Sequence, residues 1–236
     1  MKEKTWNYLN NPFESALKNS YVKLYAFAAN HKEKLFSLSE DSFIATLYHD
    51  YFMPSFTQYK SLYNQLNELQ ANYHAQTEQL TNLMANLSGK KIGRWAVQIQ
   101  YVYENDSQTY LYLLGKGRKS FQNGSYTNRI QAVEDLLNRV KKYDLLSKVQ
   151  TDIQTFLNHL QETYSLQHQL AGEIKIISHS LKLQKEALLQ SLHHVYTGLC
   201  WHYKHDIQTV ACFYELSYLK TYASTSENNE NENLTP

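Results

Sequence analysis

Residues 59–87 read YKSLYNQLNELQANYHAQTEQLTNLMANL, and this stretch decides the fold class. Nine positions from Tyr59 to Leu87, spaced alternately by three and four residues, hold eight apolar side chains, and the exception is Gln76. This period places the apolar side chains on one face of a helix. The stretch therefore predicts a long amphipathic helix that packs against other helices.

A second stretch of the same kind runs from Val149 to Leu188, where nine of twelve seam positions are apolar. Further apolar residues widen both seams, so each long helix must cover more than one neighbour. We therefore expect a mainly α protein, an elongated antiparallel helical bundle whose long helices pack as in coiled coils. Seam glutamines such as Gln167 and Gln184 would then need hydrogen-bond partners.

Helix-start signals mark the shorter helices. Asn11-Pro12 combines a capping side chain with a proline at the first helical position. Comparable signals lie at residues 39–41, at Ser125 and after Asp206. Pro54 is expected to end or kink the helix that starts near residue 41, because proline lacks an amide hydrogen.

Glycine and arginine are concentrated in the middle of the chain. Five of the seven glycines and all four arginines fall within residues 89–139. Turns favour glycine, whereas helix interiors disfavour it. The predicted division is an N-terminal helical arm (1–88), a basic glycine-containing insertion (89–125), a C-terminal helical arm packed on the first (126–223) and an acidic tail expected to be disordered (224–236).

The insertion contains an alternating pattern of apolar residues, followed by a turn sequence at residues 104–107. The alternating apolar positions are Trp95, Val97, Ile99, Tyr101 and Tyr103. We favour a small β-hairpin over residues 94–114 on this pattern. A helix stays open as the alternative, because Trp95, Ile99 and Val102 also share one helical face.

The insertion ends in a basic loop, GKGRKSFQNGS at residues 115–125, that leads into a predicted helix. Free amides at the helix start, the helix dipole and the cations of Arg118, Lys119 and Arg129 would suit a phosphate or carboxylate, with Ser125 as the cap. We expect both arginines at the surface. The loop matches neither a Walker loop nor a dinucleotide fingerprint, so a turn with solvated charges is the alternative interpretation.

The basic middle also bears on nucleic acid as a partner. Residues 86–142 hold ten Lys and Arg against four Asp and Glu, a local net charge of +6. Neighbouring aromatic rings offer stacking faces for single-stranded nucleic acid. The whole chain carries a net charge of only +1, so nucleic acid is not the favoured partner.

Catalytic, metal and cofactor motifs of high specificity are absent from the sequence. The segment from His193 to His205 holds four histidines and Cys200, but its spacing matches no closed zinc pattern. Histidines at an interface are the favoured interpretation. The chain also lacks Glu-x-x-His, His-Glu-x-x-His and Gly-x-Ser-x-Gly. We therefore assign no catalytic residue and expect no metal and no cofactor.

Composition favours a cytoplasmic protein without membrane contact. The N-terminus has no apolar run behind its charges, and no stretch reaches the roughly 18 apolar residues of a membrane span. Cys200 and Cys212 are interpreted as buried thiols, not a disulfide.

The leading hypothesis for function is a non-enzymatic helical scaffold or protein-interaction module, with an unknown protein partner or self-association. The alternative is an anion- or nucleic-acid-binding module that uses the arginine-bearing middle. An enzyme with an unrecognised site stays open.

Overall fold

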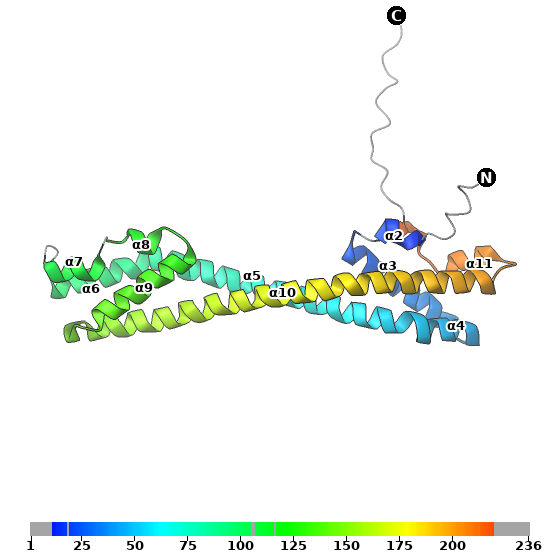
Figure 1. Ribbon diagram of the computed structural model, residues 1–236, viewed down its shortest axis with the longest axis horizontal. Coiled ribbons are helices and arrows are strands. Elements are labelled where there is room, and N and C mark those ends of the chain that lie inside the picture. Colours follow the sequence, from blue (N-terminus) through cyan, green and yellow to red (C-terminus); the bar gives the residue numbers. More distant parts are fainter. Residues whose placement is uncertain (1–10, 18, 105–106, 116, 220–236) are drawn as a thin grey trace, which may run out of the picture. The chain divides into compact units, whose positions relative to one another are not determined.

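The computed structural model describes residues 11–17, 19–104, 107–115 and 117–219. Within these ranges the chain forms helices and no strand, which confirms the prediction of a mainly α protein. Two compact units divide the chain: unit 1 comprises residues 1–66 and 176–236, and unit 2 comprises residues 67–175. Figure 1 colours the elements along the chain.

The elements follow one another with short connections. In chain order they are α2 (Pro12–Leu17), α3 (Tyr21–Ser37), α4 (Ser42–Thr46), the π-helical segment η1 (Leu47–Phe52), α5 (Met53–Asn86), the π-helical segment η2 (Leu87–Lys91), α6 (Ile92–Val102), α7 (Gln108–Leu114), α8 (Lys119–Gln122), α9 (Tyr126–Val140), the 3-10 segment η3 (Asp144–Leu146), α10 (Ser147–His202), α11 (Ile207–Cys212) and the 3-10 segment η4 (Leu216–Leu219). The division of the sequence at residues 88 and 125 stays a prediction, and the acidic tail lies outside the described residues.

The first predicted seam falls on α5 and ends at Leu87 on η2, and the second falls on α10; none of their positions is exposed. Two of the half-buried seam glutamines, Gln167 and Gln184, form side-chain hydrogen bonds. In unit 1 the Gln184 side chain donates to the carbonyl oxygen of Ser55 (3.0 Å), and in unit 2 the Gln167 side chain donates to the Thr77 hydroxyl (2.8 Å). The Ser191 hydroxyl on α10 donates to the carbonyl of Tyr51 on η1 (2.7 Å), also in unit 1.

Capping side chains begin the short helices of unit 1 where the sequence signals them. The Asn11 side-chain oxygen accepts from the Phe13 amide (3.0 Å), and its amide group donates to the Leu189 carbonyl on α10 (2.8 Å). Asp41 caps α4 by accepting from the amides of Phe43 and Ile44. These caps satisfy amides that a helix start leaves without partners.

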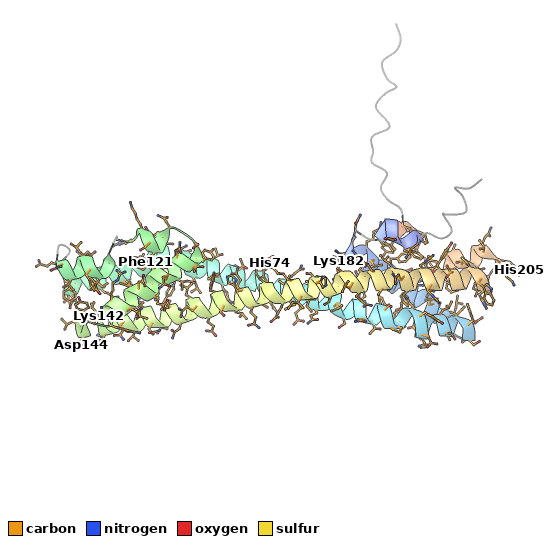
Figure 2. All side chains as sticks on the ribbon, viewed as in Figure 1. His74, Phe121, Lys142, Asp144, Lys182 and His205 are labelled. Atoms are coloured by element: carbon orange, nitrogen blue, oxygen red, sulfur yellow. The ribbon has the colours of Figure 1, made fainter. Side chains whose placement is uncertain are left out.

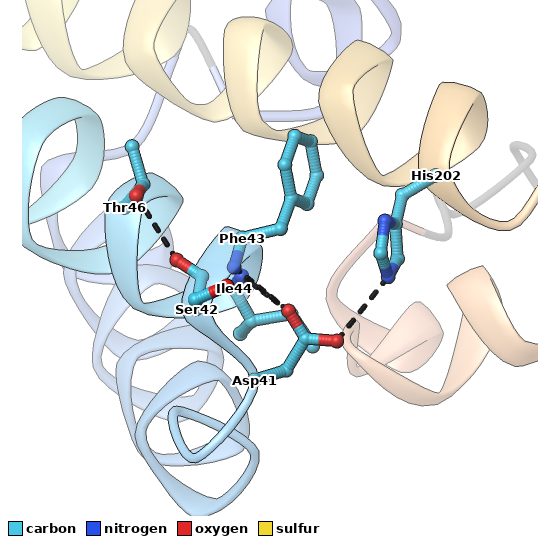
Figure 3. Close-up of polar contacts among 6 residues, drawn as sticks. All are labelled: Asp41, Ser42, Phe43, Ile44, Thr46 and His202. Carbon is cyan, nitrogen blue, oxygen red and sulfur yellow. Dashed lines mark hydrogen bonds and ion pairs between the residues drawn. The ribbon is translucent and has the colours of Figure 1, made fainter.

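Asp41 also connects α4 to the end of α10 (Figure 3). Its second carboxylate oxygen lies 3.4 Å from His202 Nε2, and the His202 ring stacks on Phe43 with 4.6 Å between centroids. The two amide hydrogen bonds at α4, followed by the charge of His202, hold the pKa of Asp41 below its ordinary value. One carboxylate thus starts α4 and links it to α10.

Unit 2 has a continuous apolar core that includes α6. Trp95 is fully buried there and meets Phe156 edge to face, with 5.7 Å between ring centroids. The indole nitrogen of Trp95 donates to Asp152 (2.8 Å), and the Lys91 ammonium pairs with the other oxygen of that carboxylate (2.8 Å). Burial raises the pKa of Asp152, but the bonds to Lys91 and Trp95 outweigh it and leave the pKa lowered.

The prediction of a β-hairpin over residues 94–114 is wrong, since the segment forms α6 and α7. Trp95 and Ile99 point into the core of unit 2, whereas Val97 and Tyr101 are exposed on the opposite side of α6. The alternating pattern arose because this helix carries apolar residues on both faces. Gly89 and Gly93, taken as turn residues, lie within helical segments.

Pro54 does not end its helix either. The chain is helical from α4 through α6, and Pro54 is the second residue of α5. Just before it, η1 has π-helical bonding, with the Met53 amide donating to the Tyr48 carbonyl. A local change of hydrogen-bond pattern is a common way for a helix to accommodate a proline, which has no amide to donate.

Candidate functional site

The four residues predicted to bind an anion lie in unit 2, but in two different environments. Ser125 caps α9, as predicted, with its hydroxyl accepting from the Asn128 amide (3.2 Å). Arg118 and Lys119 are exposed at the start of α8. Arg129 is only 8% exposed, so the expectation that it lies at the surface is wrong.

Arg129 connects three elements of unit 2. Its Nε donates to the carbonyl of Phe121 on α8 (2.9 Å), and its Nη2 donates to the carbonyl of Met84 on α5 (2.6 Å). Phe121 is labelled in Figure 2. Burial lowers the pKa of its guanidinium below the ordinary value. A guanidinium has five N–H donors, so it can bond two backbone carbonyls at once. Arg129 is therefore already bound to the protein itself.

Arg118 lies against the start of α6. Its Nη1 is 3.9 Å from the point that a Cβ on Gly93 would occupy. The Gln122 side chain donates to the Ser88 carbonyl (3.2 Å), which holds α8 against η2. The Arg118 guanidinium thus lies beside the start of α6, and α8 brings Arg118 and Lys119 toward the cations of η2 and α6.

A surface that we call the outer face of α6 consists of Lys90 on the preceding segment η2 and of Arg94, Val97 and Tyr101 on α6. Its residues are spaced by four, three and four positions, so they share one side of the helix. All four are exposed; Val97 is 59% exposed and Tyr101 is 92% exposed. The face thus changes from cationic to apolar along the helix.

Helix α7 contacts α6 and adds further exposed apolar side chains, Leu111 and Tyr112. Two cations, Arg139 near the end of α9 and Lys142 just after it, hold α7 in place. The Arg139 guanidinium donates to the Leu113 carbonyl (3.1 Å), and the Lys142 ammonium donates to the Tyr112 hydroxyl (3.1 Å). The apolar side chains beside α6 therefore sit on a helix that is fixed to the core of unit 2.

The histidine segment of unit 1 is distributed over several contacts. His194 stacks on Tyr51 with 4.3 Å between ring centroids, and His202 contacts Asp41. His205, labelled in Figure 2, is exposed. In the part of the chain that the structure describes, no three His, Cys, Asp or Glu side chains are grouped to hold a metal.

Cys200 and Cys212 are both free thiols. Cys200 is half-buried. Cys212 is exposed, so the expectation that both are buried fails for this residue. It lies on α11, whose six residues bury only Val210.

His31 is a buried residue of unit 1 that the sequence analysis did not single out. Its Nδ1 lies 2.8 Å from the Phe213 carbonyl oxygen, and its Nε2 has no hydrogen-bond partner among the described residues. Burial lowers the pKa of His31 to about 4, so the ring is neutral at pH 7. It stacks on Tyr214 with 4.4 Å between centroids. The signal was present, since His31 follows Leu24 and Phe27 at helical spacing on the buried face of α3.

No family model matches the chain, and no curated protein or solved structure is similar to it. None of the helices in the described ranges has the length and the apolar run needed to cross a bilayer. A function for the chain is therefore inferred from the geometry of unit 2.

Proposed function

We propose that the chain is a non-enzymatic helical scaffold that acts as a protein-interaction module, with the outer face of α6 as its binding surface. The observation that carries the proposal is the exposure of Tyr101 and Val97 on a helix whose opposite side is fully buried. Tyrosine and arginine are the residues most enriched at interaction hot spots. An exposed tyrosine on a fixed helix also loses little conformational entropy on binding.

The partner that fits this face is an acidic amphipathic helix. Within the described residues no hydrogen bond or ion pair involves Lys90, Arg118 or Lys119, so acidic side chains can pair with them. Arg94 is exposed as well, and its charge also contributes to the lowered pKa of Asp152. Farther along α6, Val97 and Tyr101 offer apolar area to the same partner. Charge complementarity of this kind sets orientation and speeds association. An amphipathic helix presents acidic and apolar residues at matching spacing.

The proposal includes a finer description of the fold. An antiparallel bundle with coiled-coil-like packing of α5 and α10 would give the rigid frame that a scaffold needs. Two free thiols fit a reducing compartment, so a cytoplasmic location is part of the proposal.

The test begins with a photo-crosslinking amino acid in place of Tyr101, introduced in cells that produce the protein. The same amino acid in place of Gln161, which is exposed on α10, is the control. The proposal expects a protein captured at position 101 and not at position 161, with the captured segment acidic and amphipathic. No capture, or equal capture at both positions, would refute it.

The captured segment is then made as a peptide and its affinity measured by fluorescence anisotropy. Arg94→Glu should weaken binding by about tenfold or more, and added salt should weaken it further. Lys175→Glu, a charge reversal at an exposed site on α10, should change little. Equal effects of the two reversals would contradict the role of the α6 face.

Nucleic acid is the competing partner, because Arg118, Lys119 and the amides near Ser125 still offer an anion site. The competing hypothesis requires capture of nucleic acid at position 101. It also requires oligonucleotide binding that Arg118→Gln with Lys119→Gln abolishes while Tyr101→Ala leaves it intact. That pair of results would overturn the protein-partner proposal. Capture of a second copy of this chain would also overturn it, in favour of self-association.

A further inference from the structure

A three-residue connection in unit 2, Asn123-Gly124-Ser125, joins the end of α8 to the start of α9, and all three residues are exposed. Asn123 is the only asparagine of the sequence that is followed by glycine. Within the described residues, the hydrogen bonds of this connection use only the amide of Asn123 and the carbonyl and hydroxyl of Ser125. The carboxamide of Asn123 is therefore exposed and unbound.

The peptide unit between Asn123 and Gly124 is also unbound. Neither the Asn123 carbonyl nor the Gly124 amide has a hydrogen-bond partner among the described residues. Asn123 is extended, with ψ of 152°, and Gly124 has φ of 102°, a conformation that glycine adopts at little cost. Rotation of this unit changes both angles, breaks no hydrogen bond within the protein and meets no side chain at Gly124. The Gly124 nitrogen can therefore turn toward Cγ of Asn123.

We infer that Asn123 is a site of spontaneous deamidation. The Gly124 nitrogen loses its proton and attacks Cγ of Asn123, so that an N–Cγ bond forms. The carboxamide nitrogen takes up a proton and leaves as ammonia. Water then adds to one of the two carbonyls of the five-membered succinimide, and the ring opens to aspartate or isoaspartate. Water is the only co-reactant, and nothing is oxidised or reduced.

The surroundings of Asn123 carry positive charge. The Asn123 amide donates to the carbonyl of Lys119, one turn earlier (3.0 Å), and Arg118 directly precedes Lys119. Nearby cations favour the deprotonated form of a group, here the attacking Gly124 nitrogen. The product carboxylate is ionised at neutral pH. Deamidation therefore lowers the positive charge of the surface that holds Arg118 and Lys119.

The test is peptide mapping by mass spectrometry of the full chain after storage in mildly alkaline buffer. Asn67 and Asn82, both exposed on α5, are internal controls. Asn123 is expected to deamidate about tenfold faster or more, because the amide that follows each control must first break a helical hydrogen bond. Isoaspartate, detected with isoaspartyl methyltransferase, should form at position 123, since it arises only through the succinimide.

Asn123→Gln is the matched variant. It keeps the carboxamide, but its side chain is one methylene longer, so attack by the Gly124 nitrogen would have to close a six-membered ring. We expect no isoaspartate from this variant over the same period. A parallel sample in guanidinium chloride compares the folded and unfolded chains, and the two rates at Asn123 should be similar, because rotation of the unbound peptide unit breaks no hydrogen bond.

Three outcomes would overturn the inference. Equal rates at Asn123, Asn67 and Asn82 would remove position 123 as a preferred site. Aspartate without isoaspartate would exclude the succinimide route. A rate in the folded chain that is about tenfold or more below the rate in guanidinium chloride would show that the peptide unit is held by the fold.

Discussion

Replacing Arg129 should destabilise unit 2 far more than replacing Arg118, although both were expected to serve the same anion site. Arg129 donates two hydrogen bonds, to the carbonyls of Phe121 and Met84, from a position only 8% exposed. Hydrogen bonds from charged groups contribute about 1.5 to 3 kcal/mol each. Part of this is offset, because the variant no longer buries a guanidinium. We therefore expect Arg129→Gln to lower the free energy of unfolding by about 2 to 4 kcal/mol.

Arg129→Lys is the intermediate variant. It keeps the charge but replaces the fork of donors with a single ammonium that cannot reproduce both contacts. We expect a loss of about 1 to 2 kcal/mol, close to one hydrogen bond from a charged group. Arg118→Gln, at an exposed site, should cost less than about 0.5 kcal/mol.

The assay is urea unfolding followed by the fluorescence of Trp95, which is fully buried in unit 2. The chain has three tryptophans, so Trp6→Phe and Trp201→Phe in the background leave Trp95 as the reporter of unit 2. Unfolding midpoints are compared among variants whose transitions have the same slope, because a changed slope signals loss of two-state behaviour. Similar midpoints for Arg129→Gln and Arg118→Gln would refute the assignment of Arg129 to the core.

Three further predictions follow from buried contacts. In the folded protein the pKa of His31 is about 4, below the ordinary 6.5, so between these pH values the folded protein binds fewer protons than the unfolded chain. The free energy of unfolding should therefore fall by about 3 kcal/mol as the pH drops from 6.5 to 4. His31→Phe should abolish this dependence in denaturation curves recorded over a range of pH. Leu160→Ala should lower the free energy of unfolding by about 2 to 5 kcal/mol, because Leu160 is fully buried on the α10 seam, whereas Gln161→Ala should change it little. Equal losses for the two variants in chemical denaturation would contradict the seam assignment. Asp152→Ala should lower the free energy of unfolding by about 1 to 3 kcal/mol, because the bonds to Lys91 and Trp95 are lost, while Asp144→Ala at an exposed site should not. Because the pKa of Asp152 is lowered in the folded protein, its stabilising contribution is present at neutral pH and should disappear as the pH falls below the ordinary range of a carboxyl group.

The sequence predicted those parts of the fold that depend on local chemistry. Helix starts at Asn11 and Ser125 follow from side chains that bond amides two or three residues away. The α5 and α10 seams follow from a periodic pattern that persists over many turns, so a single polar residue such as Gln167 does not hide it. Such signals require no knowledge of distant segments.

Features that depend on contacts between distant segments were missed. Whether Val97 and Tyr101 face a core or solvent depends on which side of α6 meets α10, and no local rule decides that. The pattern of residues 94–103 therefore resembled a strand. Pro54 was expected to end or kink its helix, and it does not end it; the π-helical segment just before it cannot be recognised from composition.

The candidate site also depends on contacts between distant segments, because these contacts decide which cations are bonded within the protein and which are exposed. In the sequence all Lys and Arg residues between residues 86 and 142 contribute equally to the local charge, but in the structure some of them are bonded to acceptors within the protein. Arg129 and Arg139 bind backbone carbonyls, and Lys91 binds Asp152. Each stabilises unit 2 and has little left to offer a ligand.

Four of the exposed cations between residues 86 and 142 come from neighbouring elements. Lys90 lies on η2, Arg94 on α6, Lys119 on α8 and Arg118 directly before α8, and two contacts bring these elements together: Gln122 on the Ser88 carbonyl, and Arg118 beside Gly93. Two further exposed cations, Lys141 and Lys142, follow α9 instead. The +6 of the sequence is therefore partly internal structure and partly a surface cluster next to Tyr101, and only the second part can select an acidic partner.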